Sequence, residues 1–457
     1  MLQPVSFPLA QPELALDLHG GLLRRTVHPS GLRILTENMP GARSASIGFW
    51  VAIGSRDEQS ERADAPGSLG STHFLEHLLF KGTPSLGAYD IARAFDKMGA
   101  DHNALTAKEH TAYYAKVRDA NIAEATSLLA QMVTDSIIDE REFELERGVI
   151  LEELAMAADD LADVAGEKFF ETVLAGHPLG RPIGGNPQTI LTAQRDAVMR
   201  HYQETYLPST LIVTAAGAVD HDQFVQTVTD ALNSAQAKRW SLNASKAPVA
   251  RRNQGQTALE LKEKTSEINV IVTQKPSEQV HIMLGSQGLQ AGHDKRFAFG
   301  VMNSVLGGGM SSRLFQEIRE KRGFAYATYS FGASYSDAGL FGMYAASKPE
   351  KARDVAKLMQ DELAKIAADG ISEEEFERIL GQIAGSSALV LEDSDTRMSR
   401  LARSELGTGE FYDLDVSLKR FEEVTADEVR EAAQMMLSNP AHLVAVGDIS
   451  PEQLLDV

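Results

Sequence analysis

The chain of 457 residues contains no cysteine. This absence excludes a disulfide scaffold, a thiol nucleophile and any zinc or iron–sulfur site that is held by thiolates. It leaves the redox compartment open, because a protein without thiols suits both reducing and oxidising spaces. Any zinc site in this chain must therefore be built from histidine and carboxylate side chains.

Long hydrophobic runs are also missing. The longest stretch without a charged side chain, Phe297 to Ser312, carries four glycines and three serines and is not a membrane span. The first twenty residues show neither a basic region followed by an apolar run nor the Arg- and Ser-rich pattern of a mitochondrial presequence. We therefore expect a cytoplasmic protein with no membrane partner, although a processed precursor would look the same.

Basic residues are outnumbered. The chain has 44 Lys and Arg against 64 Asp and Glu, a net charge of −20. Binding to a nucleic-acid backbone needs Lys and Arg, so we expect no nucleic-acid partner. An acidic surface mostly provides solubility, and it would also favour basic or neutral peptides as substrates.

An internal repeat divides the chain into two similar halves. Residues 191–217 and 424–447 each read as an amphipathic helix with a Thr-Ala start, a proline stop, an apolar strand and a glycine. The alignment pairs Thr192 with Thr425, Pro208 with Pro440 and Gly217 with Gly447.

A polar segment without a sustained apolar period separates the halves. We predict a first domain over 20–233, a linker over 234–264 and a second domain over 265–457. Each half begins with alternating apolar segments, continues into long helical patterns such as 119–135 and 140–175, and returns to a strand. This order predicts an α+β fold used twice, each copy a mostly antiparallel sheet packed with helices.

A short helix that starts near Thr72 and stops at Gly82 carries the sequence His73-Phe74-Leu75-Glu76-His77. Two imidazoles at i and i+4 lie on one helical face, and both can reach one zinc ion. Glu76 points to the same side and is placed to act on a metal-bound water. The pattern H-x-x-E-H is the inverted form of the common zinc-protease helix. By itself it is moderate evidence, because an exposed helix with two histidines and a glutamate also occurs by chance.

A third ligand would come from elsewhere in the fold. The helical stretch 140–157 holds Glu146, Glu152 and Glu153. Glu146 and Glu153 are seven residues apart and share a face, so one could bind the metal while the other orients a ligand. A glutamate-rich helix is more often a solvated surface, and the spacing alone leaves both interpretations open.

The complete set of motifs resembles the pitrilysin/insulin-degrading-enzyme family of inverzincin zinc metallopeptidases. Within it, the chain is most similar to the half-length branch that contains the mitochondrial processing peptidase β subunit and its bacterial relatives. The resemblance covers nearly the whole chain. It is carried by HFLEHLLFKGT (73–83), NALTAKEHTAYYA (103–115), ERGVILEEL (146–154), HPLGRPIGG (177–185), EQVHIMLG (278–285) and LGGGMSSRLFQEIREKRGFAYATYS (306–330).

The resemblance implies a role for each residue of the metal site. His73, His77 and Glu153 match the ligands of one Zn²⁺ per chain, and Glu76 matches the general base. Glu146 matches the acidic residue that lies behind the ligands. Such a site has three protein ligands and one open position, as in catalytic zinc sites.

The resemblance also implies substrate contacts. Asn103 and Ala104 match the edge-strand pair that holds the substrate backbone, and Arg319 and Tyr326 match an Arg…Tyr pair that contacts the substrate near the scissile carbonyl. His102 stands where relatives have a bulky apolar residue. We interpret it as a surface residue on the opposite side of the strand, or else as a source of a more polar subsite.

The function that the resemblance implies is zinc-dependent endopeptidase activity on unfolded peptides or presequence-like segments. Cleavage would occur in an enclosed chamber, a peptidasome in which two chains close like a clamshell. A homodimer is expected, with Arg319 and Tyr326 of one subunit completing the site of the other. Two alternatives stay open: a catalytically silent scaffold subunit, and a catalytic subunit that needs a different partner chain.

Overall fold

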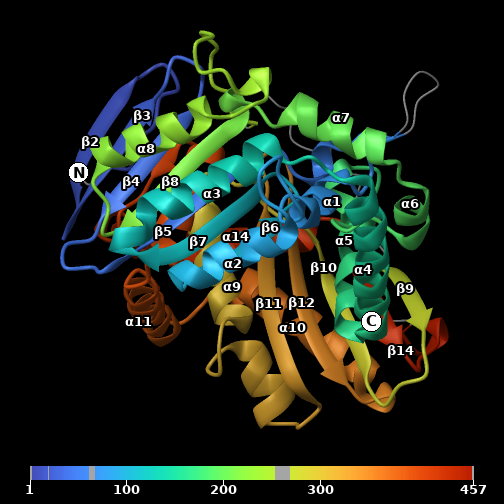
Figure 1. Cartoon of the computed structure of the whole chain (residues 1–457). Helices are drawn as coiled ribbons and strands as arrows, with labels where there is room; N and C mark the ends of the chain where they lie inside the picture. Colours follow the sequence, from blue (N-terminus) through green and yellow to red (C-terminus); the bar gives the residue numbers. More distant parts are fainter. Residues whose placement is uncertain (1–2, 19, 61–66, 253–267, 455–457) are drawn as a thin grey trace.

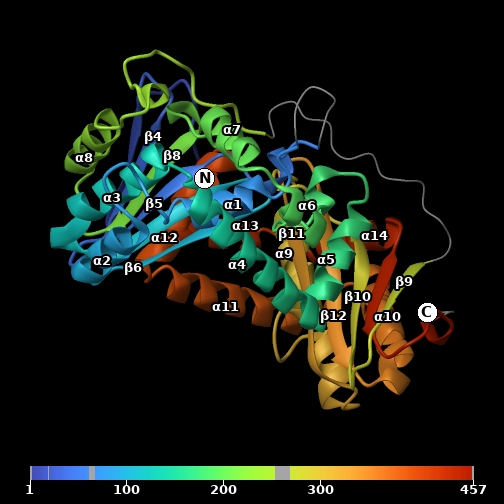
Figure 2. The same ribbon diagram turned by 45° about the vertical axis from the view of Figure 1, so that its right-hand side comes forward.

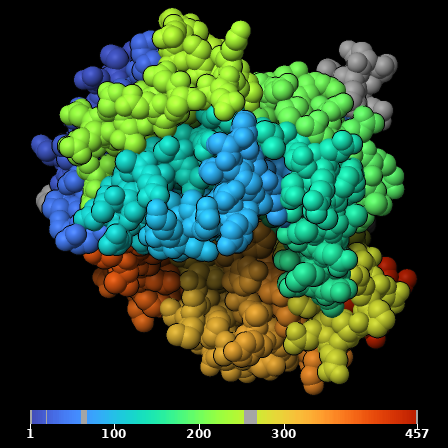
Figure 3. All heavy atoms as spheres, in the orientation of Figure 1, coloured from blue at the N-terminus to red at the C-terminus, as the bar shows by residue number. Residues whose placement is uncertain are grey.

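Two large β-sheets, each with its own helices, make up most of the described chain (Figure 1). The computed structural model describes residues 3–18, 20–60, 67–252 and 268–454. The part of the predicted linker from 253 to 264 lies outside these residues. Figure 3 shows the blue-to-green surface of the first half above the gold and yellow surface of the second.

The first sheet has seven strands in the order β2-β3-β4-β8-β5-β7-β6, and the second has five in the order β11-β12-β10-β14-β9. The first comprises β2 (Glu13–Leu18), β3 (Gly21–Val27), β4 (Arg33–Asn38), β5 (Ser44–Val51), β6 (Asp101–Thr106), β7 (Thr111–Arg118) and β8 (Leu211–Gly217). The second comprises β9 (Asn269–Gln274), β10 (Val280–Gln287), β11 (Ala325–Ser334), β12 (Gly339–Ser347) and β14 (His442–Gly447).

The two sheets repeat one topology, which confirms the predicted α+β fold used twice. Strand β8 runs parallel to β4 and antiparallel to β5, as β14 does with β9 and β10. Continuing outward, β7 corresponds to β12 and β6 to β11, so β6 and β11 occupy equivalent edges. The first sheet adds β2 and β3. A short pair, β1 (Val5–Ser6) with β13 (Glu410–Phe411), joins the start of the described chain to the segment that follows Leu406.

Helices cover both sheets. Those of the first half are α1 (Ser71–Leu78), α2 (Ala88–Met98), α3 (Ile122–Asp135), α4 (Glu140–Asp159), α5 (Leu161–Val173), α6 (Pro187–Thr192), α7 (Arg195–Thr205) and α8 (His221–Asn233). Those of the second are α9 (Arg296–Gly307), α10 (Ala352–Asp369), α11 (Glu373–Val390), α12 (Ser394–Leu406), α13 (Leu414–Glu422) and α14 (Ala426–Ser438). A π-helical turn spans Phe315–Glu320.

The repeat motif differs at its start and agrees at its end. Thr425 caps α14, whereas Thr192 is the last residue of α6 and α7 begins only at Arg195. The predicted Thr-Ala helix start is therefore wrong for the first copy. Gly217 and Gly447 both end a central strand with positive φ, and a Cβ at either would lie within 3 Å of a neighbouring backbone oxygen.

The helical pattern over 140–175 is interrupted. Asp160 ends α4, and its carboxylate accepts hydrogen bonds from the backbone N–H groups of Ala162 and Asp163 at the start of α5. A side chain that caps a second helix competes with continuation of the first. The two helices therefore separate at this residue.

Each half places one helix on the sheet of the other. Helix α5 packs against the second sheet, where Phe169 and Val173 share a buried cluster with Tyr344. Helix α12 packs against the first sheet through a cluster that includes Leu401 and Trp50. In Figure 2, α11 runs below the first sheet towards the second, where α10 lies. The packing thus crosses the predicted domain boundary in both directions.

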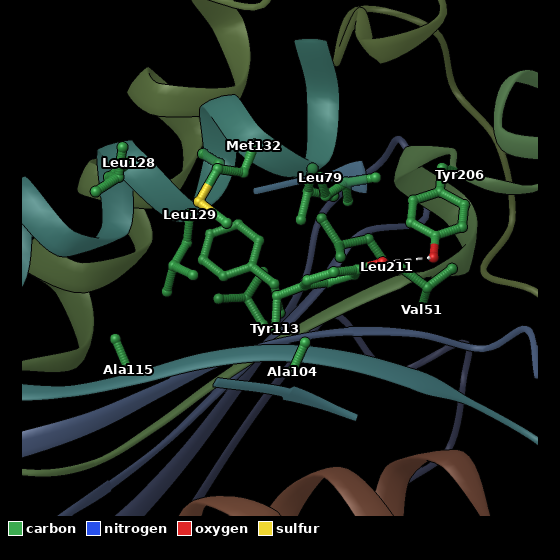
Figure 4. Close-up of a cluster of buried hydrophobic side chains, with 14 of the residues drawn as sticks. Val51, Leu79, Ala104, Tyr113, Ala115, Leu128, Leu129, Met132, Tyr206 and Leu211 are labelled. Carbon is green, nitrogen blue, oxygen red and sulfur yellow. Dashed lines mark hydrogen bonds between the residues drawn. The ribbon is translucent and has the colours of Figure 1, made fainter. Parts of the chain in front are cut away.

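The core of the first half lies between its sheet and α3 (Figure 4). Ala104 and Ala115 project from the paired strands β6 and β7 towards Leu128 and Met132 of α3. Tyr113 is also buried here, and its hydroxyl lies 3.0 Å from that of Tyr206. One face of β6 is therefore fixed by the core, which holds the strand in place at the sheet edge.

Candidate active site

Helix α1 is held by apolar packing on one side. Phe74, Leu75 and Leu78 are buried, and the Phe74 ring stacks on Phe143 of α4 with centroids 4.8 Å apart. His73, at i−1 from Phe74, faces away from that core and remains only partly covered. Apolar and polar residues alternate within the two turns of this helix. The polar side chains therefore stay partly exposed and face helix α4.

A buried carboxylate fixes the start of this helix. Glu58 accepts hydrogen bonds from the backbone N–H groups of Gly70 and Thr72, both at 2.8 Å. Burial raises the pKa of Glu58 to about 7, while these two bonds act in the opposite direction. Anions at a helix N-terminus satisfy unpaired N–H groups and interact favourably with the helix dipole.

Three donor atoms converge next to α1. The Nε2 atoms of His73 and His77 are 3.3 Å apart, and Oε2 of Glu153 lies 3.6 Å from the first and 3.5 Å from the second. Two donors that each lie ~2.0–2.1 Å from a tetrahedral zinc ion are roughly 3.3–3.4 Å apart. The spacing of these three donor atoms therefore fits a zinc ion. In the described part of the chain, His73, His77 and Glu153 form a group that could bind a metal.

The protonation chemistry of the donors also fits a cation. Burial and the neighbouring His77 lower the pKa of His73, which favours the neutral, metal-binding imidazole. On the other ring, Nδ1 of His77 lies 3.0 Å from Oε2 of Glu146, whose second oxygen binds Nζ of Lys81 at 2.6 Å. A carboxylate that accepts the Nδ1 proton leaves the Nε2 lone pair directed at the metal.

Glu76 is linked to the edge strand. Its Oε2 accepts a hydrogen bond of 2.5 Å from the hydroxyl of Thr106, at the end of β6. Glu76 is half-buried and lies on the same helix as His73 and His77. The strand that was predicted to hold substrate is thus joined directly to the predicted base.

Strand β6 presents its outer edge to solvent, and none of the described strands pairs with that edge. Asn103 is exposed, and Ala104 is 7% exposed. The backbone N–H of Ala104 donates to Oδ1 of Asn103 at 2.8 Å instead of to β7. This donor therefore faces the free edge and is occupied by a side chain that can turn away.

His102 is not a surface residue, so the interpretation of it as one on the opposite side of the strand is wrong. Its ring stacks on Phe95 of α2 with centroids 4.0 Å apart and planes at 10°, and the Phe80 centroid is 6.0 Å away. Because side chains alternate along a strand, His102 shares the core-facing side with Ala104. An imidazole can take the place of an apolar residue here because its face stacks on an aromatic ring.

Arg319 and Tyr326 form a stacked pair on the second half. The Arg319 guanidinium lies 4.6 Å from the ring centroids of both Tyr326 and Phe315. Tyr326 is 77% exposed and sits in a register shift between Ala325 and Thr328 of β11. A bulge of this kind re-aims a side chain, and here it turns the tyrosine outward.

The predicted residues thus fall into two groups. His73, His77, Glu153, Glu146 and Glu76 come together on α1 and α4, with β6 beside them. Among the described residues, Arg319 and Tyr326 make no hydrogen bond, ion pair or ring contact with that group. Tyr326 lies on β11, the edge strand of the second sheet, and Arg319 lies in the π-helical turn that precedes this strand.

Sequence reasoning missed three residues that support the site: Glu58, Lys81 and Thr106. Lys81 and Thr106 lie inside the matched motifs HFLEHLLFKGT and NALTAKEHTAYYA, so their place near the site was signalled although their partners were not. Glu58 precedes α1 by more than ten residues, and its contact with the helix start is a tertiary one that the sequence does not signal.

Comparisons with known proteins agree with this geometry. Residues 33–187 match the family model described as Insulinase (Peptidase family M16). Residues 192–383 match a second family model, which is described as Peptidase M16 inactive domain. The chain belongs to peptidase family M16. The group of His73, His77 and Glu153 lies in the part that matches the first description.

Relatives in family M16 share most of their length with this chain. An uncharacterized zinc protease of Streptomyces coelicolor is 42% identical over 95% of this chain and 92% of that protein. One from Mycobacterium tuberculosis is 40% identical, covering 91% of both, and one from Bacillus subtilis is 34% identical, covering 93% of this chain and 98% of that protein.

Two solved structures share the fold. A protease from Helicobacter pylori has a TM-score of 0.82 at 20% identity, covering 94% of this chain and all of that one. A peptidase M16 inactive domain from Pseudomonas fluorescens has a TM-score of 0.81 at 17% identity, covering 93% and 97%. Among the described residues, no helix is both long and apolar enough to cross a lipid bilayer.

Proposed function

We propose that this protein is a zinc-dependent endopeptidase that cleaves extended, unfolded peptides. The observation that carries the proposal is the convergence of His73, His77 and Glu153 beside Glu76, in a chain whose relatives are named zinc proteases. His73, His77 and Glu153 would hold the ion. A bound zinc ion would make water a nucleophile near neutral pH and polarise the scissile carbonyl.

The side chains of the site have distinct tasks in this reaction. Glu76 takes the proton of the attacking water and passes it to the leaving amine. Thr106 donates to one oxygen of Glu76 and so directs the other oxygen towards the substrate. Glu146 accepts the Nδ1 proton of His77 and keeps that imidazole in the tautomer that binds a metal.

The substrate would add to the sheet as a further strand. Backbone pairing with the free edge of β6 gives affinity with mild sequence selection. A bound peptide carbonyl would replace Oδ1 of Asn103 as the acceptor for the Ala104 N–H. Folded domains cannot offer a free extended strand, and presequence-like or denatured segments can.

The Arg319–Tyr326 pair supports a shared site in a homodimer. The exposed Tyr326 ring and the stacked Arg319 are ordered by each other and by Phe315, apart from the metal group of their own chain. We propose that they contact the substrate in the site of a second copy and help to stabilise the oxyanion. Two chains would then enclose two zinc sites.

Digestion of an unbiased peptide library tests the proposal. The purified zinc-loaded chain is expected to cleave unstructured peptides internally and to stop when a chelator is added. Peptides drawn from a compact domain should be cut, and the same domain when folded should be spared. Cleavage that continues in the chelator would contradict the zinc assignment, and no cleavage by a zinc-loaded dimer would favour a silent scaffold subunit or a chain that needs a different partner.

A further inference from the structure

A cavity lies at the seam between the two halves, and none of the predicted zinc ligands lines it. Its volume is ≈ 390 Å³. Its wall comes from the turn between β6 and β7, the segment 249–252, the turn between β11 and β12, and the end of α12. Both halves of the chain therefore contribute to a single pocket.

Positive charge is buried without balance in the wall of this cavity and directly behind it: Arg33 and Arg251 line the cavity, and both bind Glu405. Glu405 accepts hydrogen bonds from Arg25 at 2.9 Å, from Arg33 at 3.3 Å and from Arg251 at 2.9 Å. All four residues are at most 6% exposed. Three guanidinium groups share one carboxylate, which leaves two positive charges in excess. Buried charges normally find full compensation, because desolvating an unpaired ion is costly.

Arg33 is the guanidinium that remains incompletely bound. Its Nη1 reaches Glu405, whereas its Nε and Nη2 are buried and have no hydrogen-bond partner among the described residues. These two atoms form the edge of the guanidinium that grips two oxygens of a carboxylate or phosphate at once. Burial lowers the pKa of Arg33 to about 10, which leaves the side chain charged at neutral pH.

The remaining charges of the wall do not cancel this excess. Glu109 and Asp337 both bind Arg56. Their two negative charges are balanced by Arg56 and by Lys108, which also lines the cavity. Arg252 forms a bidentate salt bridge with Asp57, and both of its hydrogen bonds are 2.7 Å long. Burial, then Arg403 and Arg252, lower the pKa of His110 to about 4, so this imidazole is neutral. Arg403 is exposed at the cavity and has no ion pair with a described residue. The pocket is thus cationic in a chain of net charge −20.

We propose that this cavity binds a small organic oxyanion, a carboxylate or a phosphate ester. The head group pairs with the free edge of Arg33 and with Arg403, and the body of the ligand lies against the apolar part of the lining, which includes Ile53, Tyr335 and Leu406. A volume of this size suits a small molecule. Because the wall belongs to both halves, the bound anion holds them together.

Thermal unfolding of the zinc-loaded full chain tests this site. Sodium phosphate or sodium acetate replaces sodium chloride at constant ionic strength, so that general screening is unchanged. A ligand that binds only the folded state raises the midpoint of unfolding in a saturable way. A rise with one of the two anions, or with both, supports the proposal and assigns the head group.

Variants locate the anion. Arg403→Gln removes one charge-assisted contact and should raise the half-saturating concentration about tenfold. Arg33→Met removes a buried, uncompensated charge, so the midpoint in chloride should stay the same or rise while the response to the anion is lost. Arg43→Gln, at a side chain 87% exposed in the connection between β4 and β5, should respond as the wild type does. The site would be overturned if the unfolding midpoint of the wild type showed no saturable rise with either anion. It would also be overturned if the midpoints of Arg33→Met and Arg403→Gln rose as much as that of the wild type.

Discussion

The Nε2 atoms of His73 and His77 lie 3.3 Å apart on successive turns of one helix, and one oxygen of Glu153 lies within 3.6 Å of both. Three electron-rich atoms held this closely repel one another unless a proton or a metal ion lies between them. The helix is fixed by Glu58 at its start and by Phe74 on its buried face. The site is therefore preorganised for a metal ion.

The adjacent glutamates on α4 provide a matched pair for testing the third ligand. Glu153→Gln should weaken zinc binding by more than about 100-fold, because it removes a charged ligand and not merely a residue behind one. Glu152→Gln changes the neighbouring exposed residue in the same way and should leave zinc affinity unchanged. Competition with a chromogenic chelator measures both. Equal affinities of the two variants would contradict the assignment.

Thr106 is expected to act by positioning Glu76. Thr106→Val removes the 2.5 Å hydrogen bond to the carboxylate and should lower kcat about tenfold, with zinc content unchanged. Thr106→Ser keeps the hydroxyl and should recover most of the loss, whereas Thr192→Val, at an exposed threonine, should have no effect. Steady-state turnover of a fluorogenic peptide checks the series. A serine variant as slow as the valine variant would mean that packing, and not the hydrogen bond, matters at this position.

The shared-site proposal predicts complementation between two inactive chains. A Glu76→Gln chain lacks the base, and a Tyr326→Phe chain lacks a tyrosine hydroxyl for its partner. In a mixed dimer, one site combines an intact Glu76 with an intact Tyr326, so mixing should restore peptide turnover. Light scattering with differently tagged chains establishes that mixed dimers form. Mixed dimers that stay as slow as the parents would show that sites are not shared.

Glu58 predicts a pH-dependent stability. Its pKa is about 7 in the folded chain, above the ordinary value of 4.5, so the folded state binds the proton more tightly than the unfolded state. This contribution to the free energy of unfolding is greatest below pH 4.5 and is lost as the pH rises through 7. The total loss over this range is on the order of 3 kcal/mol. Denaturation at pH 4.5 and 8, in a chelator, compares the wild type with Glu58→Gln.

The difference in the free energy of unfolding between the wild type and Glu58→Gln should change between pH 4.5 and pH 8, because the variant has no carboxyl group at this position to titrate. Glu140→Gln, an exposed residue of α4, should keep the pH profile of the wild type. A wild-type profile that matches Glu58→Gln would contradict the raised pKa of Glu58.

Short-range patterns account for what the sequence could predict. The spacing of His73, Glu76 and His77 fixes their common face through helix geometry, and the resemblance added Glu153 and Glu146 from a helix 70 residues later. The repeat predicted two similar sheets because Gly217 and Gly447 end equivalent strands. These features depend on local periodicity or on a recurring motif, both of which can be read along the chain.

Long-range contacts account for what the sequence could not predict. The exchange of α5 and α12 between the sheets depends on tertiary packing, and amphipathic patterns do not say which sheet a helix covers. The stacking of His102 on Phe95 and the hydrogen bond from Thr106 to Glu76 join segments that are distant or on different elements. Asp160 ended α4 because its side chain caps α5, which a continuous apolar pattern conceals.

The central claim, that Glu76 is the base of a zinc peptidase, is tested most directly by one paired measurement on Glu76→Gln: zinc per chain and peptide turnover in the same sample. The variant should keep one zinc ion, because His73, His77 and Glu153 are intact, and should lose about 10²–10⁴-fold in kcat. Wild-type turnover in the zinc-loaded variant would contradict the account.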